Sequence, residues 1–299
     1  MLNINRALKN DRLLRALTGL NRKAFDQLCE VFEVVYQESI ESDTKPRKRA
    51  RGGGRKARLS SIEFKLFFIL FYFKCYPTFD VLSWLFDLDR GRANRWVHRL
   101  QGILETALGK KMLLPERKLE NIEQFLEKFP AVREVIFDGT ERPVQRPKDA
   151  EKQKEHYSGK KKRHTRKHIT GSTRTKRVIL LSEARAGKIH DKRQLDEADL
   201  VSNIPDLVRI EGDLGFQGLQ NEFVNIHLPH KKPRGKELSD QQKQENKEFS
   251  SQRVVCEHAH AGIKRYNAVS AIYRNRVPDF DDRLMLTAAG LWNFYLEAA

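Results

Sequence analysis

The stretch AVREVIFDGTERPVQRP, residues 131–147, decides the fold. Its run Val135–Phe137 is apolar at every position, which is too short for a helix and typical of a strand that is buried on both faces. Asp138 follows at once, and Gly139-Thr140 is expected to turn the chain there. A carboxylate placed where a buried strand meets a loop is a common support for a metal ion or a catalytic group.

The residues beyond this strand predict a mixed sheet with helices packed on it. Two antiparallel strands are expected at 164–173 and 177–184, joined near Gly171-Ser172. A helix is expected at 190–204, with Asp191 as its cap, and the position of Asp191 after a strand leaves open a role in supporting the metal ligands. It is followed by a strand at 208–213, an optional strand at 224–228, a helix at 240–266 and a last helix at 280–297. This order of elements is that of the ribonuclease-H-like fold, so the C-terminal half is predicted to be an α/β domain.

The N-terminal half is predicted to be helical. Apolar residues recur at helical spacing from Asn21 to Gln37, where Asn21 can cap the helix, and Ser60 or Ser61 is expected to cap the next helix. The run FKLFFILFYF, residues 64–73, is too short to span a bilayer and predicts a buried helix that stops at Pro77. A short helix capped by Thr78 and a longer helix from Arg90 to about residue 108 come next. Two helices joined by a tight turn, the second of them basic, are typical of a helix-turn-helix motif.

The basic faces of the second of these helices form the predicted DNA-binding surface. Its members are Arg90, Arg92, Asn94, Arg95 and Arg99. A three-helix bundle with a solvated basic face stays open as the alternative, because such motifs also arise by chance. The three tryptophans are expected to be core residues: Trp84, Trp96 and Trp292.

A strongly basic segment lies between the first long helix and the helix-turn-helix. It holds eight Lys or Arg residues between Lys45 and Arg58, together with Pro46 and the run Gly52–Gly54. A phosphate-binding loop is not expected there, since no strand precedes the glycines. A solvated linker and an arm along the DNA backbone both fit. The predicted domains are residues 1–58, an N-terminal helix with this linker; 59–130, the helix-turn-helix domain with a connector that holds a helix at 116–128; and 131–299, the α/β domain.

The charge and the cysteines narrow the class of protein. The chain has 299 residues and a formal net charge of +17 at pH 7, which predicts a polyanionic partner. Because no segment is apolar over a membrane-spanning length, nucleic acid is favoured over a membrane surface. Cys29, Cys75 and Cys256 are odd in number and in no CxxC spacing, so neither a disulfide framework nor a zinc site is expected. With no signal peptide in the sequence, the cytoplasm is the expected compartment.

Two further carboxylates are expected to meet Asp138. Asp213 ends the strand at 208–213, and Glu257 lies on the long helix within SSQRVVCEHAHAGIKRY. Neighbouring strand ends are about 5–10 Å apart, and a helix across the sheet could bring Glu257 to both. Clustered carboxylates repel one another, and a pair of Mg²⁺ or Mn²⁺ ions would relieve that repulsion. Two such ions can activate a water or a 3′-hydroxyl and stabilise the leaving oxygen of a phosphodiester.

Four segments together carry a family resemblance: DGTERPVQRP, YSGKKKRHTRK, GDLGFQG and RVVCEHAHAGIKRY. In this order they resemble the DDE transposases of bacterial insertion sequences, in the group related to the Harbinger elements. The resemblance covers most of the chain. It implies that Asp138, Asp213 and Glu257 are the catalytic and metal-binding triad of a ribonuclease-H-like fold, with two Mg²⁺ (or Mn²⁺) ions. It also implies cleavage at transposon ends and joining of strands to target DNA.

A second basic set is expected to hold DNA phosphates near these carboxylates. Its members are Lys160, Lys161, Lys162, Arg163, Arg166 and Lys167, with Lys264 and Arg265 further along the chain. A solvated charged hairpin is the alternative. The expected partners are double-stranded DNA, as terminal inverted repeats and as target, and further copies of the chain in a homodimer or larger assembly. The expected location is the bacterial cytoplasm, in association with the nucleoid.

Two other functions stay open at this stage. The first is a DNA-binding regulator with an inactive catalytic domain, which would bind DNA without metal-dependent chemistry. The second is a general nuclease of the same fold, which would cleave many substrates and join no strands.

Overall fold

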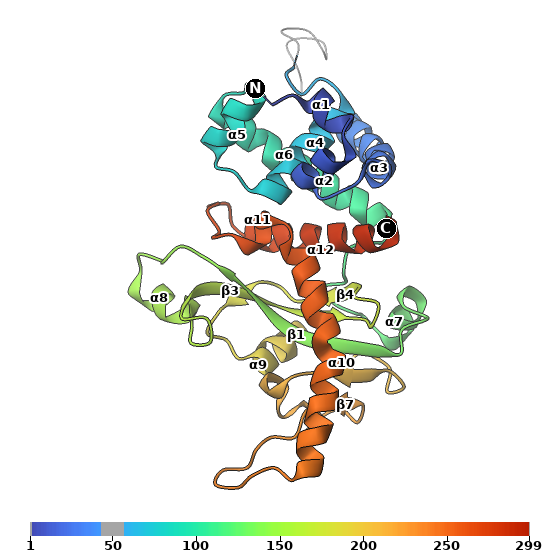
Figure 1. Ribbon diagram of the computed structural model, residues 1–299, viewed down its shortest axis with the longest axis vertical. Helices are drawn as coiled ribbons and strands as arrows, with labels where there is room; N and C mark the ends of the chain where they lie inside the picture. The colour runs from blue at the N-terminus through green and yellow to red at the C-terminus, as the bar shows by residue number, and fades with distance from the viewer. Residues whose placement is uncertain (1, 43–56, 299) are drawn as a thin grey trace. The chain divides into compact units, whose positions relative to one another are not determined.

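The structure is a computed structural model that describes residues 2–42 and 57–298 (Figure 1). Most of the predicted basic linker, with its three successive glycines, lies outside the described residues. The chain divides into two compact units. The first unit comprises Met1–Leu114, Lys264–Ala271 and Leu284–Ala299, and the second unit comprises Pro115–Ile263 and Ile272–Arg283. The domain boundaries after residues 58 and 130 stay a prediction.

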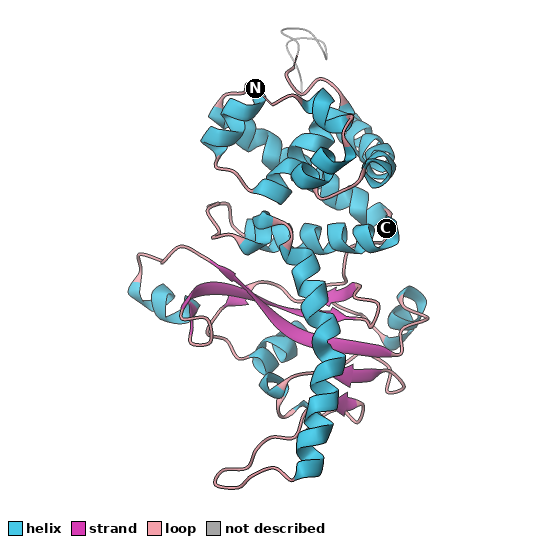
Figure 2. Cartoon of the chain, in the orientation of Figure 1, coloured by secondary structure: helices cyan, strands magenta, loops and turns pink. Residues whose placement is uncertain are grey.

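The first unit is helical throughout its described residues (Figure 2). The predicted caps are confirmed: Asn21, Ser61 and Thr78 each accept a backbone N–H at the start of a helix. The predicted apolar helix is also confirmed, and all of its residues from Lys65 to Phe73 are buried. The bounds are α1 Ile4–Leu8, α2 Asp11–Thr18, α3 Arg22–Glu41, α4 Ile62–Cys75, α5 Phe79–Phe86, α6 Arg90–Lys110 and α11 Asn267–Ser270, and most of α12 Phe280–Ala298 belongs to this unit.

The helices α5 and α6 and the short turn between them form the expected two-helix motif. Asp87 ends α5 in the left-handed conformation, with φ of 50°. Asp89 begins α6, where its side chain accepts the backbone N–H of Arg92. Phe86 packs edge-on against Phe68 of α4, with ring centroids 4.8 Å apart. These contacts fix α5 and α6 on the buried helix α4.

The expectation that all three tryptophans are core residues is wrong for Trp84. Its residue surface is 73% exposed, because the buried stripe of α5 consists of Leu82 and Phe86. Trp292 is buried, and Trp96 is half-buried.

The second unit is a mixed sheet with flanking helices, as predicted (Figure 2). The strand order is β2-β3-β1-β6-β7, and β4 and β5 pair with β3. Strand β1 is antiparallel to β3 and parallel to β6, and β6 is parallel to β7. The strands are β1 Glu134–Pro143, β2 Tyr157–Ser158, β3 Arg163–Ser172, β4 Val178–Leu181, β5 Arg185–Ala186, β6 Arg209–Glu211 and β7 Ile226–His227. The helices are α7 Ile122–Lys128, α8 Ala150–His156, α9 Asp191–Ala198 and α10 Asp240–Lys264, with 3-10 turns η1 Leu214–Phe216 and η2 Leu219–Asn221.

The two faces of β1 have different partners. Val135 and Phe137 belong to a buried apolar cluster that includes Phe125 of α7 and Leu195 of α9. Because successive side chains of a strand alternate between faces, Asp138 projects from the opposite face. There α10 crosses the sheet (Figure 1) and brings His260 to Asp138. The strand therefore separates the apolar core from the carboxylate.

Several predicted boundaries differ from the structure. Strand β1 does not turn after Asp138 but continues to Pro143, because β3 pairs with it along its whole second half. The hairpin between β3 and β4 turns at residues 173–177 instead of near Gly171-Ser172. Helix α7 begins at Ile122, where Asn121 caps it, and α9 ends at Ala198, where Asp199 takes the left-handed conformation.

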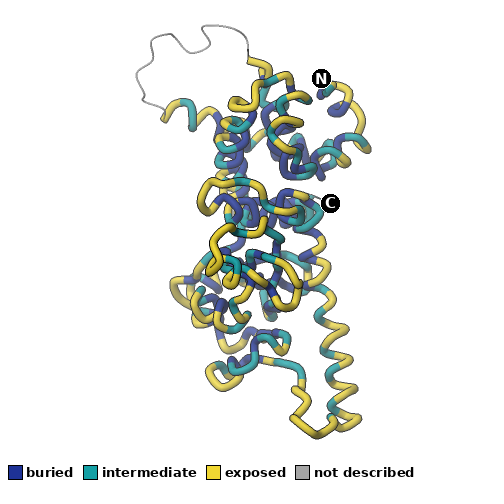
Figure 3. The backbone as a smooth tube through the Cα atoms, turned by 90° about the vertical axis from the view of Figure 1, so that its left-hand side faces the viewer, coloured by how far each residue is buried: buried dark blue, intermediate teal, exposed yellow. Residues whose placement is uncertain are grey.

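Helix α10 changes in character along its length. Its first part, residues 240–252, is mostly exposed (Figure 3), whereas Cys256, Ala259, His260 and Ile263 are buried. Over the described part of the chain, none of the helices combines the length and the apolarity that a membrane crossing requires.

Candidate active site

Asp138 lies in the middle of β1, just past the end of a neighbouring strand. It pairs with Thr170 of β3 on one side. On the other side, the last residue pair between β1 and β6 is Ile136 with Glu211. The expectation that Asp138 marks the end of its own strand is therefore wrong. However, β6 ends beside it at Glu211, and the place where β1 continues past this end is called the sheet opening below. The carboxylate is held on rigid backbone at that opening.

Three side chains of α10 surround the Asp138 carboxylate. Arg253 Nη2 is 3.8 Å from Oδ1, and His260 Nδ1 is 3.4 Å from Oδ2. Cys256 Sγ is 3.9 Å from Oδ2. Burial raises the pKa of Asp138 above its ordinary value, although the charge of Arg253 acts in the opposite direction. Burial also raises the pKa of the Cys256 thiol to about 12, so this thiol stays protonated at neutral pH.

His260 is in turn held by β3. Its Nε2 lies 2.7 Å from Thr170 Oγ1, and Thr170 is the residue paired with Asp138 across the sheet. If the hydroxyl donates to Nε2, then Nδ1 carries the proton that faces the carboxylate, which can only accept. Strand β3 and helix α10 thus act together on the orientation of Asp138.

Asp213 lies two residues after the end of β6, whereas it was expected to be the last residue of that strand. Its Oδ1 accepts the backbone N–H of Gly215 at 2.8 Å and so begins the turn η1. Since β6 is the parallel neighbour of β1, Asp213 lies at the same sheet opening as Asp138.

The structure adds a third aspartate, Asp191, for which the sequence left open a helix cap or a supporting role beside the site. Asp191 is not the N-cap of α9: that position is His190, which makes no side-chain capping bond. The Asp191 carboxylate instead accepts a 2.7 Å hydrogen bond from Lys167 Nζ. A Cβ atom built on Gly139 would lie 3.2 Å from Asp191 Oδ1, so this carboxylate lies against the residue that follows Asp138. Only the long-range pairing of β3 with β1 could have revealed this.

Glu257 is exposed on α10 and is not among the side chains that meet Asp138. The helix presents Arg253, Cys256 and His260 to β1, and Glu257 is one position beyond that stripe. Across residues 2–42 and 57–298, no three Asp, Glu, His or Cys side chains are already arranged as a metal-binding group. The expected three-carboxylate cluster is therefore not formed by the side-chain positions of this structure.

The residues at the sheet opening nevertheless fit a divalent cation. A Cβ atom built on Gly215 would lie 2.8 Å from both Asp191 Oδ2 and Asp213 Oδ1, so the missing side chain leaves a cradle between two carboxylates. Carboxylate oxygens are the hard ligands that Mg²⁺ and Mn²⁺ prefer. Asp138 and Asp213 supply such ligands from neighbouring segments, and Glu257 is next to Cys256, which contacts Asp138.

The basic residues expected near the site separate into two groups. The exposed residues are Lys160, Lys161, Lys162 and Arg163. The positive charge of Lys160 acts to lower the pKa of Asp138 and so favours the ionised carboxylate. Arg166 is half-buried and pairs with Asp281 at 2.8 Å. Lys167 is buried on Asp191. The exposed group is thus the part of the set that solvent and a ligand can reach.

The basic residues expected in the first unit are mostly on its surface. Arg90, Arg92, Arg95 and Arg99 are exposed, and Asn94 is half-buried. Arg92 pairs with Asp89 at 3.0 Å, within the motif itself. Arg265, also in this unit, is bonded to the Gly19 carbonyl at 2.8 Å and lies over the Tyr295 ring, so it has a structural role. Lys264 is half-buried.

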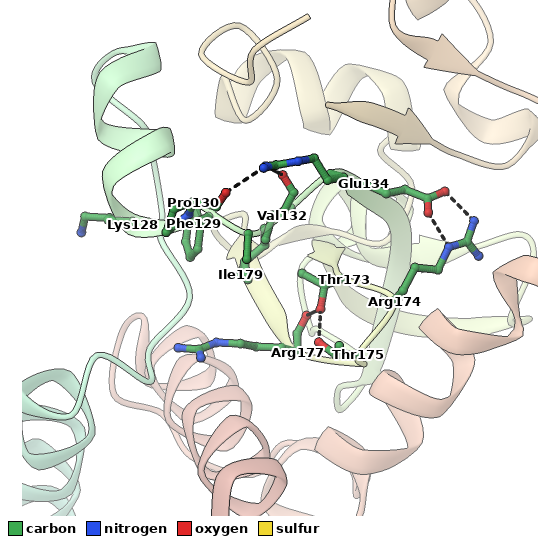
Figure 4. A pocket seen from close by; sticks show the side chains of 12 residues that line it. Lys128, Phe129, Pro130, Val132, Glu134, Thr173, Arg174, Thr175, Arg177 and Ile179 are labelled. Carbon is green, nitrogen blue, oxygen red and sulfur yellow. Dashed lines mark hydrogen bonds and ion pairs between the residues drawn. The ribbon is translucent and has the colours of Figure 1, made fainter. Parts of the chain in front are cut away.

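A cavity of about 440 Å³ lies elsewhere in the second unit, and Asp138 does not line it (Figure 4). On its rim Arg174 bonds both Glu134 and Glu211. Glu211 is fully buried, and burial together with the neighbouring Glu134 raises its pKa to about 7. Since Arg174 also donates to the Gln252 carbonyl, this ion cluster ties the hairpin to α10 and is structural in character.

The comparisons with known proteins agree with this architecture. Residues 137–293 match the family described as DDE superfamily endonuclease, and residues 57–110 match the helix-turn-helix of DDE superfamily endonuclease. The chain is 30% identical over 291 residues to the probable transposase for insertion sequence element IS702 of Microchaete diplosiphon, which covers 95% of each chain. No solved structure matches it. The strand, the sheet opening and the two-helix motif are thus those of a chain that belongs to the DDE superfamily of endonucleases.

Proposed function

We propose that this protein is a transposase that cleaves DNA at the ends of its own element and joins the strands to target DNA. The observation that carries the proposal is the placement of Asp138 and Asp213 at one sheet opening, within the segment that matches the endonuclease family. The relative whose printed name is a probable transposase covers nearly the whole chain and supports the finer assignment.

Asp138, Asp213 and Glu257 are proposed to hold two Mg²⁺ or Mn²⁺ ions. When bound, such ions activate the attacking oxygen and stabilise the leaving oxygen of a phosphodiester. The chain's own part is positioning and charge compensation. Asp138 lies on β1, and its carboxylate contacts His260 of α10. Glu257 lies on the same helix as His260. A shift of α10 or a rotation of the Glu257 side chain that brought this carboxylate to Asp138 would complete the set.

The proposed partner is double-stranded DNA. Arg90, Arg92, Asn94, Arg95 and Arg99 would bind the terminal inverted repeats, and the exposed residues Lys160–Arg163 would hold phosphates near the carboxylates. Arg166, Lys167, Lys264 and Arg265 are less accessible and would contribute indirectly. Because both ends of an element must be held at once, we further propose a homodimer or larger assembly on DNA in the bacterial cytoplasm, associated with the nucleoid. We also propose that the protein is related to the Harbinger group. Its domains are proposed to end at residues 58 and 130.

The test is a strand-cleavage and strand-joining assay with purified protein, DNA that carries the element's ends, and Mg²⁺ or Mn²⁺. Asp138→Asn, Asp213→Asn and Glu257→Gln should each abolish both reactions and retain DNA binding, because removal of one ligand disables the metal site but leaves the basic surfaces intact. Asp206→Asn, a change of an exposed aspartate of the same unit, is the matched control and should stay active.

Two results would replace the proposal with one of its rivals. DNA binding without any metal-dependent cleavage by the unaltered protein would indicate a regulator with an inactive catalytic domain. Equal cleavage of end-containing and random DNA, with no strand joining, would indicate a general nuclease. Full activity of the Asp138→Asn variant would show that Asp138 is not part of the active site.

A further inference from the structure

Asp191 and Lys167 form a buried ion pair behind the strand that carries Asp138. Lys167 Nζ donates to Asp191 Oδ1 at 2.7 Å and to the Ile189 carbonyl at 2.6 Å. The Lys167 side chain is 9% exposed and the Asp191 side chain is 17% exposed. Gln194 of α9 holds the same region of β3 by donating to the Lys167 carbonyl at 2.9 Å. The start of α9 is therefore fixed to β3 by several bonds.

The register of the sheet shows on which face this pair lies. Gly139 pairs with Ile169 across β1 and β3, and Lys167 is two residues before Ile169 on the same face. Asp138 and its partner Thr170 project from the other face, toward α10. The pair thus supports the strand from the side opposite to the Asp138 carboxylate.

Two glycines make close contact with Asp191 possible. A Cβ atom on Gly139, directly after Asp138, would meet Asp191 Oδ1 at 3.2 Å. A Cβ atom on Gly215, in the turn that Asp213 begins, would meet Asp191 Oδ2 at 2.8 Å, which is closer than real Cβ contacts. One carboxylate therefore lies against the backbone next to both proposed metal ligands, and a methyl group at Gly215 would also meet Asp213 Oδ1 at 2.8 Å.

We propose that Asp191 is a positioning residue for the metal site. Anchored by Lys167, its carboxylate sets the separation between the strand segment that carries Asp138 and the turn that Asp213 begins. This inference rests on the proposed function, since it assumes that Asp138 and Asp213 bind divalent cations. It gives Lys167 a role other than contact with DNA.

The experiment measures Mn²⁺ binding to the full chain by isothermal titration calorimetry, without DNA. Asp191→Asn and Gly215→Ala should weaken Mn²⁺ binding about 10- to 100-fold, which is the usual effect of losing a residue that orients metal ligands. Lys167→Met, which removes the anchor and leaves the Asp191 carboxylate in place, should weaken Mn²⁺ binding to a similar extent, because the carboxylate is then no longer held between the two segments. Asp196→Asn, which breaks an aspartate–lysine pair on the surface of the same helix, is the matched control and should bind as the unaltered protein does.

The outcomes separate this inference from the proposed function. If Asp138→Asn abolishes Mn²⁺ binding and both Asp191→Asn and Gly215→Ala leave it unchanged, the pair has only a structural role and the inference is wrong. If Lys167→Met binds Mn²⁺ as tightly as the unaltered protein or more tightly, Asp191 does not act through its lysine anchor, which also overturns the inference; a carboxylate that is itself a ligand would bind more tightly once the lysine charge is gone. If Asp138→Asn binds Mn²⁺ normally, the proposed site fails and this inference fails with it. Thermal denaturation identifies any unfolded variant, and if Lys167→Met is unfolded, Lys167→Gln takes its place in the comparison.

Discussion

The Asp282 side chain accepts several hydrogen bonds from residues of the second unit that are far from it in the sequence. Its carboxylate accepts from Arg117 at 2.5 Å, from the backbone N–H of Ala184 at 2.9 Å, and from His168 at 3.2 Å. Burial alone would raise the pKa of Asp282, but His168 and Arg117 hold it well below its ordinary value. Burial lowers the pKa of His168 below 6.5 and keeps the ring neutral. Single residues of this kind couple the stability of the unit to pH.

The sign of that coupling follows from both shifts. Each group has a lower pKa in the folded state than in the unfolded state, so its stabilising effect is present at neutral pH and is lost in acid. For His168 the loss begins as the pH falls below 6.5, and for Asp282 as it falls below 3.8. We expect His168→Gln to lower the free energy of unfolding by about 1–3 kcal/mol near pH 7.5, because a buried hydrogen-bonded partner is lost. Near pH 5 the difference should shrink, since only the unaltered chain then loses stability by protonation of unfolded His168. Urea denaturation at both pH values measures this, and a difference that grows in acid would contradict it.

Among the helices and strands, the features that depend on residues close together in the chain were the ones that could be predicted from the sequence. The caps Asn21, Ser61 and Thr78 and the buried helix α4 depend on residues a few positions apart, and all of them were predicted. The length of β1 was not predicted, because it depends on pairing with β3, which comes later in the chain (Ile136 with Ser172 through Pro143 with Thr165). Asp191 fits the pattern of a helix start, yet a lysine from another strand binds its carboxylate. The exposure of Glu257 likewise depends on the rotation of α10 over the sheet, which its weakly amphipathic sequence does not determine.

The caps give a prediction at this scale. Thr78→Ala removes the side chain that accepts the Val81 N–H at the start of α5, and we expect it to lower the free energy of unfolding by about 1 kcal/mol. Because α5 carries the turn of the helix-turn-helix, binding to end-containing DNA should weaken as well. Thr106→Ala is the matched control: this exposed hydroxyl lies within α6, away from its cap, and donates to the Gly102 carbonyl, so its loss should be close to neutral. Equal thermal midpoints for the two variants would show that the cap contributes nothing.

At the scale of the whole molecule, the net charge of +17 should dominate the strength of DNA binding. Contact with 6–10 phosphates would weaken binding roughly 10³- to 10⁵-fold between 50 and 200 mM salt. Replacing Lys160, Lys161 and Lys162 with alanine should reduce the slope of log affinity against log salt by roughly three, because each lysine that neutralises a phosphate adds about one to that slope. Fluorescence anisotropy with an end-containing duplex measures the slope.

The control for this prediction uses lysines of the second unit on the exposed part of α10. Lys243 and Lys247 are on the surface but outside both proposed DNA-binding sets, so their replacement with alanine should change the slope far less than the triple change. If both variants reduce the slope equally, the binding depends on total charge alone and not on the segment before β3.

The first unit is assembled from separate pieces of the chain, since Gln101 donates to Thr287 at 3.1 Å and Asn293 donates to the Leu113 carbonyl at 2.8 Å. A protein product that stops early, through a frameshift or nonsense mutation before Lys264, would therefore lack part of the framework that supports the helix-turn-helix. We expect such a truncated product to be degraded instead of occupying the element's ends. Decayed copies of the gene would then be poor dominant-negative inhibitors of an intact copy in the same cell.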